Sequence, residues 1–272
     1  MTMTASSTQT DPLGMGLQGK HALITGGSHG IGLATARALA DAGCHVAICA
    51  RNEERLADSV RELKKSNVQV LGLPADAMVP ADIRRVVDGV IGAWGALNIL
   101  VNNVGGGGRW GSSVIEDTED AVWLDVFNKN VMAAVRFTRL AIPYMRRQKW
   151  GRVVTVASIH GYEGGGRPWF NMAKRAQISL MKTLAMRPDL ARDGLTFNTV
   201  APGSLMIPDT GWDHERQKDP EGFGKQVLEQ FPLGRLGTAE EVASIIAFVC
   251  SEKASLLNGA TIVVDGGESR SF

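Results

Sequence analysis

The sequence predicts an α/β fold: a single domain built on a doubly wound parallel sheet of about seven strands, with helices on both faces. Three observations lead to this expectation. Short apolar runs alternate with longer helical patterns, which is typical of a parallel sheet covered on both sides. A glycine-rich turn joins the first strand pattern to the first helical pattern. No repeat, long linker or shift in composition marks a boundary between domains.

The glycine turn has the sequence Thr25-Gly26-Gly27-Ser28-His29-Gly30-Ile31-Gly32. A strand is expected before it, over 21–25, and a helix after it, over 30–42. In this arrangement the backbone N–H groups and a helix N-terminus face a pyrophosphate. Glycines allow the sharp turn and the close approach of a phosphate, and three of them carry this role: Gly26, Gly30 and Gly32. The turn taken alone also fits a simple connection between two elements.

The remaining elements follow in the same alternation, each strand an apolar run and each helix an amphipathic pattern. The expected strands cover 45–50, 68–73, 97–102, 152–158, 195–201 and 260–264. The expected helices cover 51–65, 80–94, 119–147 with a bend at Pro143, 168–186 and 239–250. One stripe in the long helix recurs at 4-3-4-3 spacing and fits the core better than a subunit interface: Val131, Val135, Thr138, Ile142 and Met145.

Segment 204–230 is polar and follows a strand, so it is expected to be a substrate lid, or else a loop without a role. Residues 1–18 are rich in Thr and Ser and lack the apolar core of a signal peptide, which predicts a flexible N-terminal tail before a domain at 19–272. Three cysteines, Cys44, Cys49 and Cys250, have no metal-like spacing, so buried reduced thiols in a cytoplasmic protein and no metal site are expected.

Charge and hydropathy exclude several kinds of partner. The net charge of +1 gives no electrostatic case for nucleic acid or for an anionic membrane. No apolar run approaches the ~18 residues that a membrane span requires. With 272 residues, 44% of them hydrophobic, the chain is long enough to bury one sizeable core. Neither nucleic acid nor a membrane is therefore expected as a partner.

Several motifs occur together in one order: Thr25-Gly26-x-x-x-Gly30-x-Gly32, Asn102-Asn103-Val104-Gly105, Asn130, Ser158, Lys174 and Pro202-Gly203. In that order and spacing, over residues 19–268, the chain resembles the short-chain dehydrogenase/reductase family, and in particular its 3-oxoacyl-ACP reductase and glucose dehydrogenase-like members. The resemblance implies a Rossmann-type fold, a nicotinamide cofactor and a homotetramer or homodimer. It does not name a substrate.

The resemblance also implies roles for single residues. Asp76 would meet the adenine, Lys174 would bind the nicotinamide ribose, and Asn130 would hold a helix bend and a water near Lys174. Each has a plainer explanation, such as a turn former for Asp76 and a solvated charge for Lys174. The full set implied for the cofactor is Gly26, Ser28, His29, Gly30, Ile31, Gly32, Arg51, Asp76, Ala77, Asn103, Gly105, Lys174, Pro202 and Gly203.

The end of the second strand favours NADP(H) over NAD(H). An acidic residue there would bind the adenosine ribose and repel a 2′-phosphate. This chain has Ala50 at that position, followed by Arg51, whose guanidinium matches a phosphate in charge and geometry. His29 is a second, weaker donor. The alternative is that Arg51 is simply an exposed residue at a helix start.

The family's catalytic tyrosine, four residues before the lysine, corresponds to Phe170. A phenylalanine retains the ring and loses the proton that a general acid transfers. The stretch from Ser158 to position 170 is also one residue shorter than usual, and Ile207 stands where the family often has threonine. Because an engineered Tyr-to-Phe change would explain only Phe170, a naturally diverged site is favoured.

Two other groups are candidate proton donors. Tyr162 and His160 follow Ser158 in a glycine-rich loop, close to the expected carboxyl end of a strand, although for either residue taken singly a polar surface loop is the favoured explanation. The sequence thus indicates an NADP(H)-dependent oxidoreductase that transfers hydride between nicotinamide and a small carbonyl, alcohol or activated double bond, with an atypical site. The alternative is a nucleotide-binding protein with non-redox chemistry or little catalytic activity.

Overall fold

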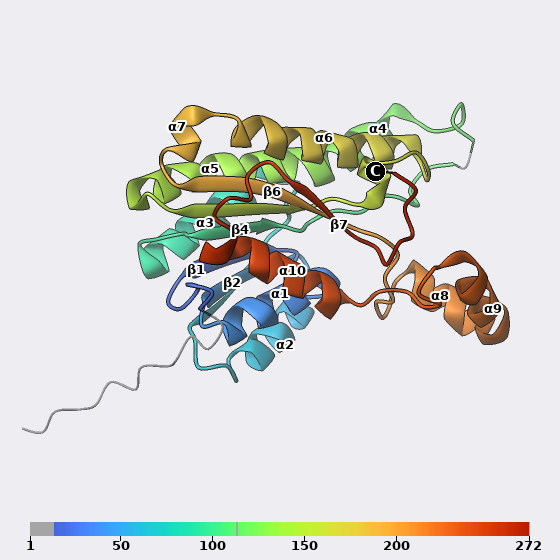
Figure 1. The fold of residues 1–272 in the computed structure, drawn as a ribbon, viewed down its shortest axis with the longest axis horizontal. Coiled ribbons are helices and arrows are strands. Elements are labelled where there is room, and N and C mark those ends of the chain that lie inside the picture. The colour runs from blue at the N-terminus through green and yellow to red at the C-terminus, as the bar shows by residue number, and fades with distance from the viewer. Residues whose placement is uncertain (1–13, 113, 272) are drawn as a thin grey trace, which may run out of the picture.

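A seven-stranded parallel sheet forms the centre of the molecule in the computed structural model, which describes residues 14–112 and 114–271 (Figure 1). The order β3-β2-β1-β4-β5-β6-β7 is that of a doubly wound sheet, as predicted. The strands are β1 His21–Thr25, β2 His45–Ala50, β3 Val70–Pro74, β4 Ile99–Asn102, β5 Gly151–Val156, β6 Leu195–Pro202 and β7 Thr261–Val264. Because the order reverses between β1 and β4, a ligand crevice is expected at their carboxyl ends.

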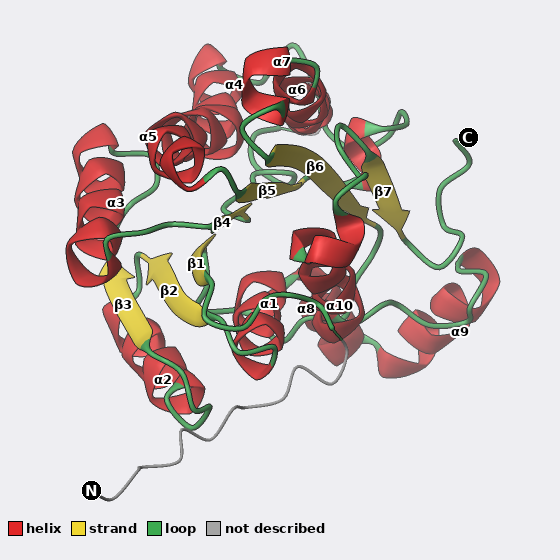
Figure 2. Ribbon diagram, turned by 60° about the vertical axis from the view of Figure 1, so that its left-hand side comes forward, coloured by secondary structure: helices red, strands yellow, loops and turns green. Residues whose placement is uncertain are grey.

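Helices cover both faces of the sheet (Figure 2). They are α1 Gly30–Asp41, α2 Glu53–Leu63, α3 Pro80–Trp94, α4 Asp120–Phe127, α5 Ala133–Gln148, α6 Pro168–Ala185, α7 Pro188–Ala191, α8 Gly211–Lys218, α9 Pro220–Gln230 and α10 Ala239–Cys250. Neighbouring strand residues point to opposite faces, so Ile24 packs with α1, α2 and α10, whereas Leu23 packs with α3, α5 and α6.

The end of the predicted tail is part of the core. Residues 1–13 lie outside the described residues, but Leu17 is fully buried among the side chains of α1 and α10. The Cys44 thiol donates to the Leu17 carbonyl over 3.3 Å. A flexible tail is therefore wrong for 14–18, because one leucine among the polar residues was sufficient to anchor the segment.

The long helix expected over 119–147 is interrupted at Asn130, where the resemblance implied a bend, and not at Pro143. Residues Asn128–Met132 form a π-helical turn between α4 and α5, and α5 continues through Pro143 to Gln148. The Asn130 amide donates to the carbonyl oxygens of Val126 and Gly106, each over 2.8 Å. In a regular α-helix the Val126 carbonyl would accept a hydrogen bond from the backbone N–H four residues later, and here it accepts from the Asn130 side chain. This replacement explains the insertion of one residue in the turn.

The core assignment of the long-helix stripe is confirmed at Val131, Thr138 and Met145, which are buried. The other two members, Val135 and Ile142, are half-buried. The three cysteines are free and buried, and burial raises the pKa of the Cys44 and Cys49 thiols to about 12.

The expected polar segment 204–230 contains two helices, α8 and α9. Trp212 on α8 packs against Phe223 and Phe231, with ring centroids 6.1 and 5.9 Å away. Asp219 begins α9 by accepting a hydrogen bond from the Gly222 N–H. The sequence analysis did not predict these helices, because glycines and charged residues interrupt the apolar pattern of the segment. Their small apolar cluster makes the segment a folded unit.

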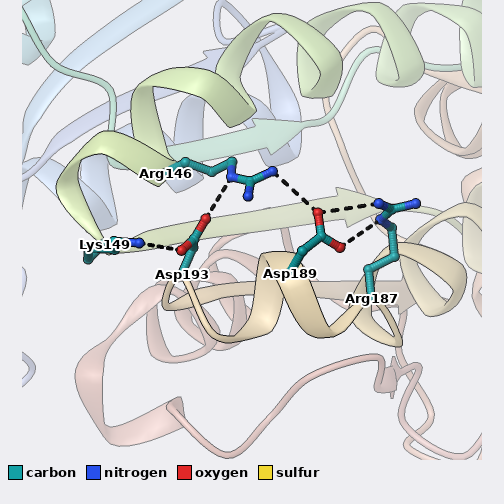
Figure 3. A network of polar contacts seen from close by, with 5 residues as sticks. All are labelled: Arg146, Lys149, Arg187, Asp189 and Asp193. Carbon is teal, nitrogen blue, oxygen red and sulfur yellow. Dashed lines mark hydrogen bonds and ion pairs between the residues drawn. The ribbon is translucent and has the colours of Figure 1, made fainter.

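An ion-pair network lies between the end of α5 and the α7 region (Figure 3). Arg146 bridges Asp193 and Asp189 over 2.6 and 3.3 Å. Hydrogen bonds from Lys149 and Arg146 hold the pKa of Asp193 below its usual value. The network joins the segments that enter β5 and β6, at the amino ends of these strands and therefore away from the crevice.

Two classes of feature are missing from the part of the chain described. No described helix is long and apolar enough to cross a membrane. Within the same residues, no group of three or more His, Cys, Asp or Glu side chains could hold a metal ion.

Burial of Leu17 gives a first prediction. Leu17→Ala should lower the free energy of unfolding by about 2–5 kcal/mol, because it removes buried methyl groups and leaves a cavity. Urea denaturation measures the change. Leu256→Ala is the control, since Leu256 is 96% exposed and its truncation should change stability by less than about 0.5 kcal/mol. An equal, small effect of both substitutions would show that residue 17 does not anchor the segment.

Candidate active site

Two cavities open at the carboxyl ends of the strands. The β2-side cavity, of about 410 Å³, is lined by residues that follow β1, β2, β3 and β4. The β5-side cavity, of about 520 Å³, is lined by residues that follow β1, β4, β5 and β6. Because His29, Asn103 and Gly105 line both, the two cavities adjoin at the switch between β1 and β4. Together they form one groove, called here the crevice.

The glycine turn forms the centre of the crevice. Gly26 and Gly30 have positive φ angles of 66° and 52°, a backbone conformation that favours glycine. A Cβ on Gly32 would lie 2.2 Å from the Gly26 carbonyl oxygen. Gly32 is therefore needed for the packing of α1 against the turn, and it is not among the residues that line the two cavities.

The N-terminus of α1 opens into the crevice without a side-chain cap at His29. Ser28 and His29 line the β2-side cavity, and Gly30 and Ile31 line the β5-side cavity. Uncapped N–H groups and the positive end of the helix dipole favour an anion. A closely approaching backbone and this helix end fit the diphosphate of a dinucleotide.

The β2-side cavity contains the residues expected for the adenosine half. Arg51 Nη1 lies 3.9 Å from Asp76 Oδ2, and the Arg51 side chain is 64% exposed. The Met78 N–H donates to Asp76 Oδ1 over 2.9 Å. Asp76 therefore shapes a turn and also faces the cavity, so its two interpretations are compatible. Ala50 and Ala77 line the same cavity.

Lys129 also lines the β2-side cavity, and the sequence analysis missed it. It belongs to the π turn, and its ammonium lies 4.6 Å from the centroid of the Trp110 ring. Burial, and then the charge of Arg51, lower the pKa of Lys129. Regular helix periodicity gives the wrong direction for a side chain in a π turn. Its place next to Asn130 was the only available signal.

Ser158, Phe170 and Lys174 line the β5-side cavity together, as the one-turn spacing predicted. The Lys174 ammonium lies 5.5 Å from the centroid of the Phe170 ring and donates to the Val156 carbonyl over 3.1 Å. Pro202 and Gly203 complete the wall after β6.

Lys174 is buried, with 4% of its surface exposed. Burial, and then the charge of Lys129, lower its pKa to about 7. A Cβ on Gly105 would lie 2.8 Å from Asn130 Oδ1 and 2.9 Å from the Lys174 ammonium, so only glycine fits between them. Asn130 thus lies beside the lysine, at the bend that the resemblance implied.

His160 and Tyr162 have different positions. His160 lines the β5-side cavity, and its ring meets Phe170 edge-on at 6.3 Å. Its backbone N–H donates to Ser158 Oγ over 3.2 Å. His160 Nδ1 is buried without a hydrogen-bond partner among the described residues. Tyr162 does not belong to the described lining of either cavity.

The 204–230 segment contacts the loops that follow β1 and β4. His29 Nε2, in the glycine turn after β1, lies 2.9 Å from the Pro208 carbonyl oxygen. Arg109 Nη2, in the loop after β4, donates to Glu215 on α8 over 2.8 Å. Ile207 and Trp212 of this segment line the β5-side cavity.

Glu268 is a second residue that the sequence analysis missed. It lines the β5-side cavity and accepts hydrogen bonds from the Ser204 N–H and hydroxyl, over 2.6 and 2.8 Å. A carboxylate beyond the last strand carries no motif, so no sequence signal pointed to it.

Comparisons with known proteins agree with this geometry. A family model described as enoyl-(acyl carrier protein) reductase matches residues 26–269. The chain is 32% identical to dehydrogenase/reductase SDR family member 4 of Oryctolagus cuniculus, over 96% of each chain. L-sorbose reductase from Gluconobacter frateurii, solved with NADPH and L-sorbose, has a TM-score of 0.87 and 35% identity, over 95% of this chain and 100% of that one.

A third similarity is to a 7α-hydroxysteroid dehydrogenase solved with NADH and 7-oxoglycochenodeoxycholic acid. Its TM-score is 0.83 at 26% identity, over 93% of this chain and 96% of that one. The chain therefore belongs to the short-chain dehydrogenase/reductase family of oxidoreductases.

The burial of Lys174 gives a prediction about pH. Its pKa is about 7 when folded against 10.5 ordinarily, so between these values the unfolded chain binds a proton that the folded chain has released. The free energy of unfolding then rises with pH in this window, and the cost of burying the charge is fully present below it. Lys174→Met should remove this contribution, a slope of up to about 1.4 kcal/mol per pH unit.

Urea denaturation from pH 7 to pH 10 measures that slope. Lys182→Met, an exposed lysine on the same helix, should leave it unchanged. An identical slope for the wild type and Lys174→Met would contradict the lowered pKa.

Proposed function

We propose that this protein is an NADP(H)-dependent oxidoreductase acting on a small carbonyl or alcohol. The observation that carries the proposal is the crevice itself, in which an uncapped helix N-terminus and a glycine turn adjoin the cavity of Ser158 and Lys174. The bound nicotinamide supplies or accepts the hydride. Lys174 would bind the ribose next to the nicotinamide, and Pro202 and Gly203 would pack against the nicotinamide ring. Asn103 and Gly105 would shape the crevice beside the glycine turn.

The β5-side cavity orients the substrate. The Ser158 hydroxyl donates a hydrogen bond to the reacting oxygen, whereas apolar side chains of Ile159, Ile207 and Trp212 hold the rest of a small molecule. The likeness to L-sorbose reductase supports carbonyl reduction as the type of reaction. An activated double bond is the alternative substrate, because its reduction would not require a phenol as proton donor.

His160 is the proton donor in this proposal, in place of the tyrosine that Phe170 replaces. His160 lines the cavity together with Phe170 and Ser158: its ring lies 6.3 Å from the Phe170 ring, and its backbone N–H donates to Ser158 Oγ. An imidazole N–H can serve as a general acid toward a reacting oxygen. Tyr162, the other candidate, lies outside the described lining, which favours His160.

NADP(H) is preferred over NAD(H) because Ala50 places no carboxylate at the end of β2 and Arg51 faces the same cavity. The neighbours alone do not decide this point, since one was solved with NADPH and another with NADH. Arg51 therefore carries the preference.

Lid, assembly and location complete the proposal. Segment 204–230 acts as the substrate lid, held by the contacts of His29 and Arg109.

A homotetramer or homodimer is proposed because Leu124 and Phe127 on α4 are 70% and 43% exposed, which is costly for large apolar side chains. Three buried free thiols suit a cytoplasmic protein.

The proposal is tested by the loss of NADPH absorbance over a panel of ketoses, keto esters and aromatic ketones. Turnover of a panel member by the wild type, abolished by Ser158→Ala, supports it. Tight NADPH binding without turnover of any member would favour the alternative, a nucleotide-binding protein with little redox activity.

Cofactor preference gives a further prediction. NADPH should bind more tightly than NADH, and Arg51→Ala should weaken NADPH by about tenfold or more, the worth of one charge-assisted hydrogen bond, with little effect on NADH. Fluorescence titration of both nucleotides measures this. Arg55→Ala, in the first turn of α2 and outside the cavity lining, is the charge-matched control. Equal weakening of both nucleotides by Arg51→Ala would refute the specificity argument.

The proton donor is tested by three substitutions on a turned-over substrate. His160→Ala should lower kcat by about 10²-fold or more, the usual worth of a general acid, whereas Tyr162→Phe should leave it nearly unchanged. Phe170→Tyr should raise turnover of generic ketones by about 10²-fold, because it restores a phenol beside Lys174. If Tyr162→Phe lowers kcat and His160→Ala does not, the assignment to His160 is wrong.

A further inference from the structure

The lining of the β2-side cavity contains more positive than negative side chains. Arg51 and Lys129 are cationic, and Asp76 is the acidic member of the described lining. Arg51 has Asp76 at 3.9 Å, whereas no described carboxylate lies within ion-pair distance of Lys129. A half-buried ammonium without a counter-ion costs solvation energy. It is stabilised when an anionic ligand enters the same cavity.

The π turn determines where this charge lies. A Cβ on Gly106 would be 3.4 Å from Lys129 Nζ, and Gly106 itself lines the β5-side cavity. The ammonium therefore lies in the β2-side cavity next to Gly106, a residue of the β5-side lining, and within reach of the charges of Arg51 and Asp76. Its influence on Lys174, in the other cavity, agrees with this position.

Lys129 and the glycine turn approach the crevice from opposite faces of the sheet. The turn leads into α1, which packs on the face covered by α2 and α10. The π turn leads into α5, whose Phe137 packs on the face covered by α3 and α6. A ligand lying across the strand ends is therefore between the N–H groups of α1 and the ammonium of Lys129.

We propose that Lys129 is a cofactor-binding residue that holds the diphosphate of the dinucleotide from the side opposite the glycine turn. The inference rests on the proposed nucleotide-binding function. A dinucleotide has its diphosphate between its two halves, and this ammonium lies next to Gly106 of the β5-side lining. The diphosphate is common to both nicotinamide cofactors, so Lys129 adds affinity without selecting between them. In the proposed function that selection falls to Arg51.

The test is titration of NADPH, NADH and 2′-AMP by protein fluorescence. Lys129→Met keeps an unbranched side chain, one heavy atom shorter, and removes the charge. It should weaken NADPH and NADH by the same factor, about tenfold or more, and leave 2′-AMP unchanged because that fragment has no diphosphate. Arg139→Met is the charge-matched control, since Arg139 is exposed on α5 and outside both cavities.

A second measurement separates direct contact from support of the Trp110 loop. Loss of a phosphate contact should flatten the dependence of log Kd on log salt concentration, and Lys129→Arg should restore both affinity and slope. Lys129→Gln serves for the binding comparison if the methionine variant does not fold by circular dichroism.

The possible outcomes distinguish this inference from the function on which it rests. Failure of the wild type to bind either nucleotide would overturn both. Normal wild-type binding with unchanged affinities in Lys129→Met would overturn this inference alone. Weakening of NADPH without NADH would place Lys129 on the 2′-phosphate and refute the diphosphate assignment.

Discussion

The hydrogen bonds of Asn103 hold the crevice together. Its amide donates to the carbonyl oxygens of Thr25 and Gly26 over 3.0 and 3.2 Å, which ties the loop after β4 to the turn after β1. Thr25 Oγ1 accepts in return from the N–H groups of Asn103 and Val104, both over 3.0 Å. These strands are neighbours at the point where the sheet order reverses. The two cavities adjoin here because this connection fixes the distance between their shared walls.

The rest of the site follows from irregular backbone at the same edge of the sheet. The π turn between α4 and α5 brings Asn130 against Gly105 and Lys129 into the β2-side cavity. A regular helix would present one of these side chains elsewhere, since consecutive positions differ by about 100° around a helix axis. Burial of Lys174 then follows from its neighbours, because Asn130, Gly105 and the Val156 carbonyl enclose its ammonium.

Most of the fold could be predicted because strand and helix patterns follow burial directly. Leu23 and Ile24 alternate in a sheet that is buried on both faces. The spacing of Phe170 and Lys174 likewise predicted their shared cavity. Lys129 could not be predicted, because its direction depends on the π turn. Glu268 depends on a contact with Ser204, 64 residues away, and Leu17 on a core that forms only when distant helices meet.

The wall of the β5-side cavity has a consequence for the order of folding. His29 and Glu268 line the same cavity, so its enclosure requires segments from both ends of the described chain. During synthesis, β1 to β4 and the glycine turn leave the ribosome long before Glu268 reaches Ser204. Contacts of such long sequence separation carry a large loop-closure entropy and tend to form late. The lining of the β2-side cavity ends at Lys129, whereas that of the β5-side cavity extends to Glu268. The walls of the β2-side cavity are therefore synthesised, and can come together, well before those of the β5-side cavity.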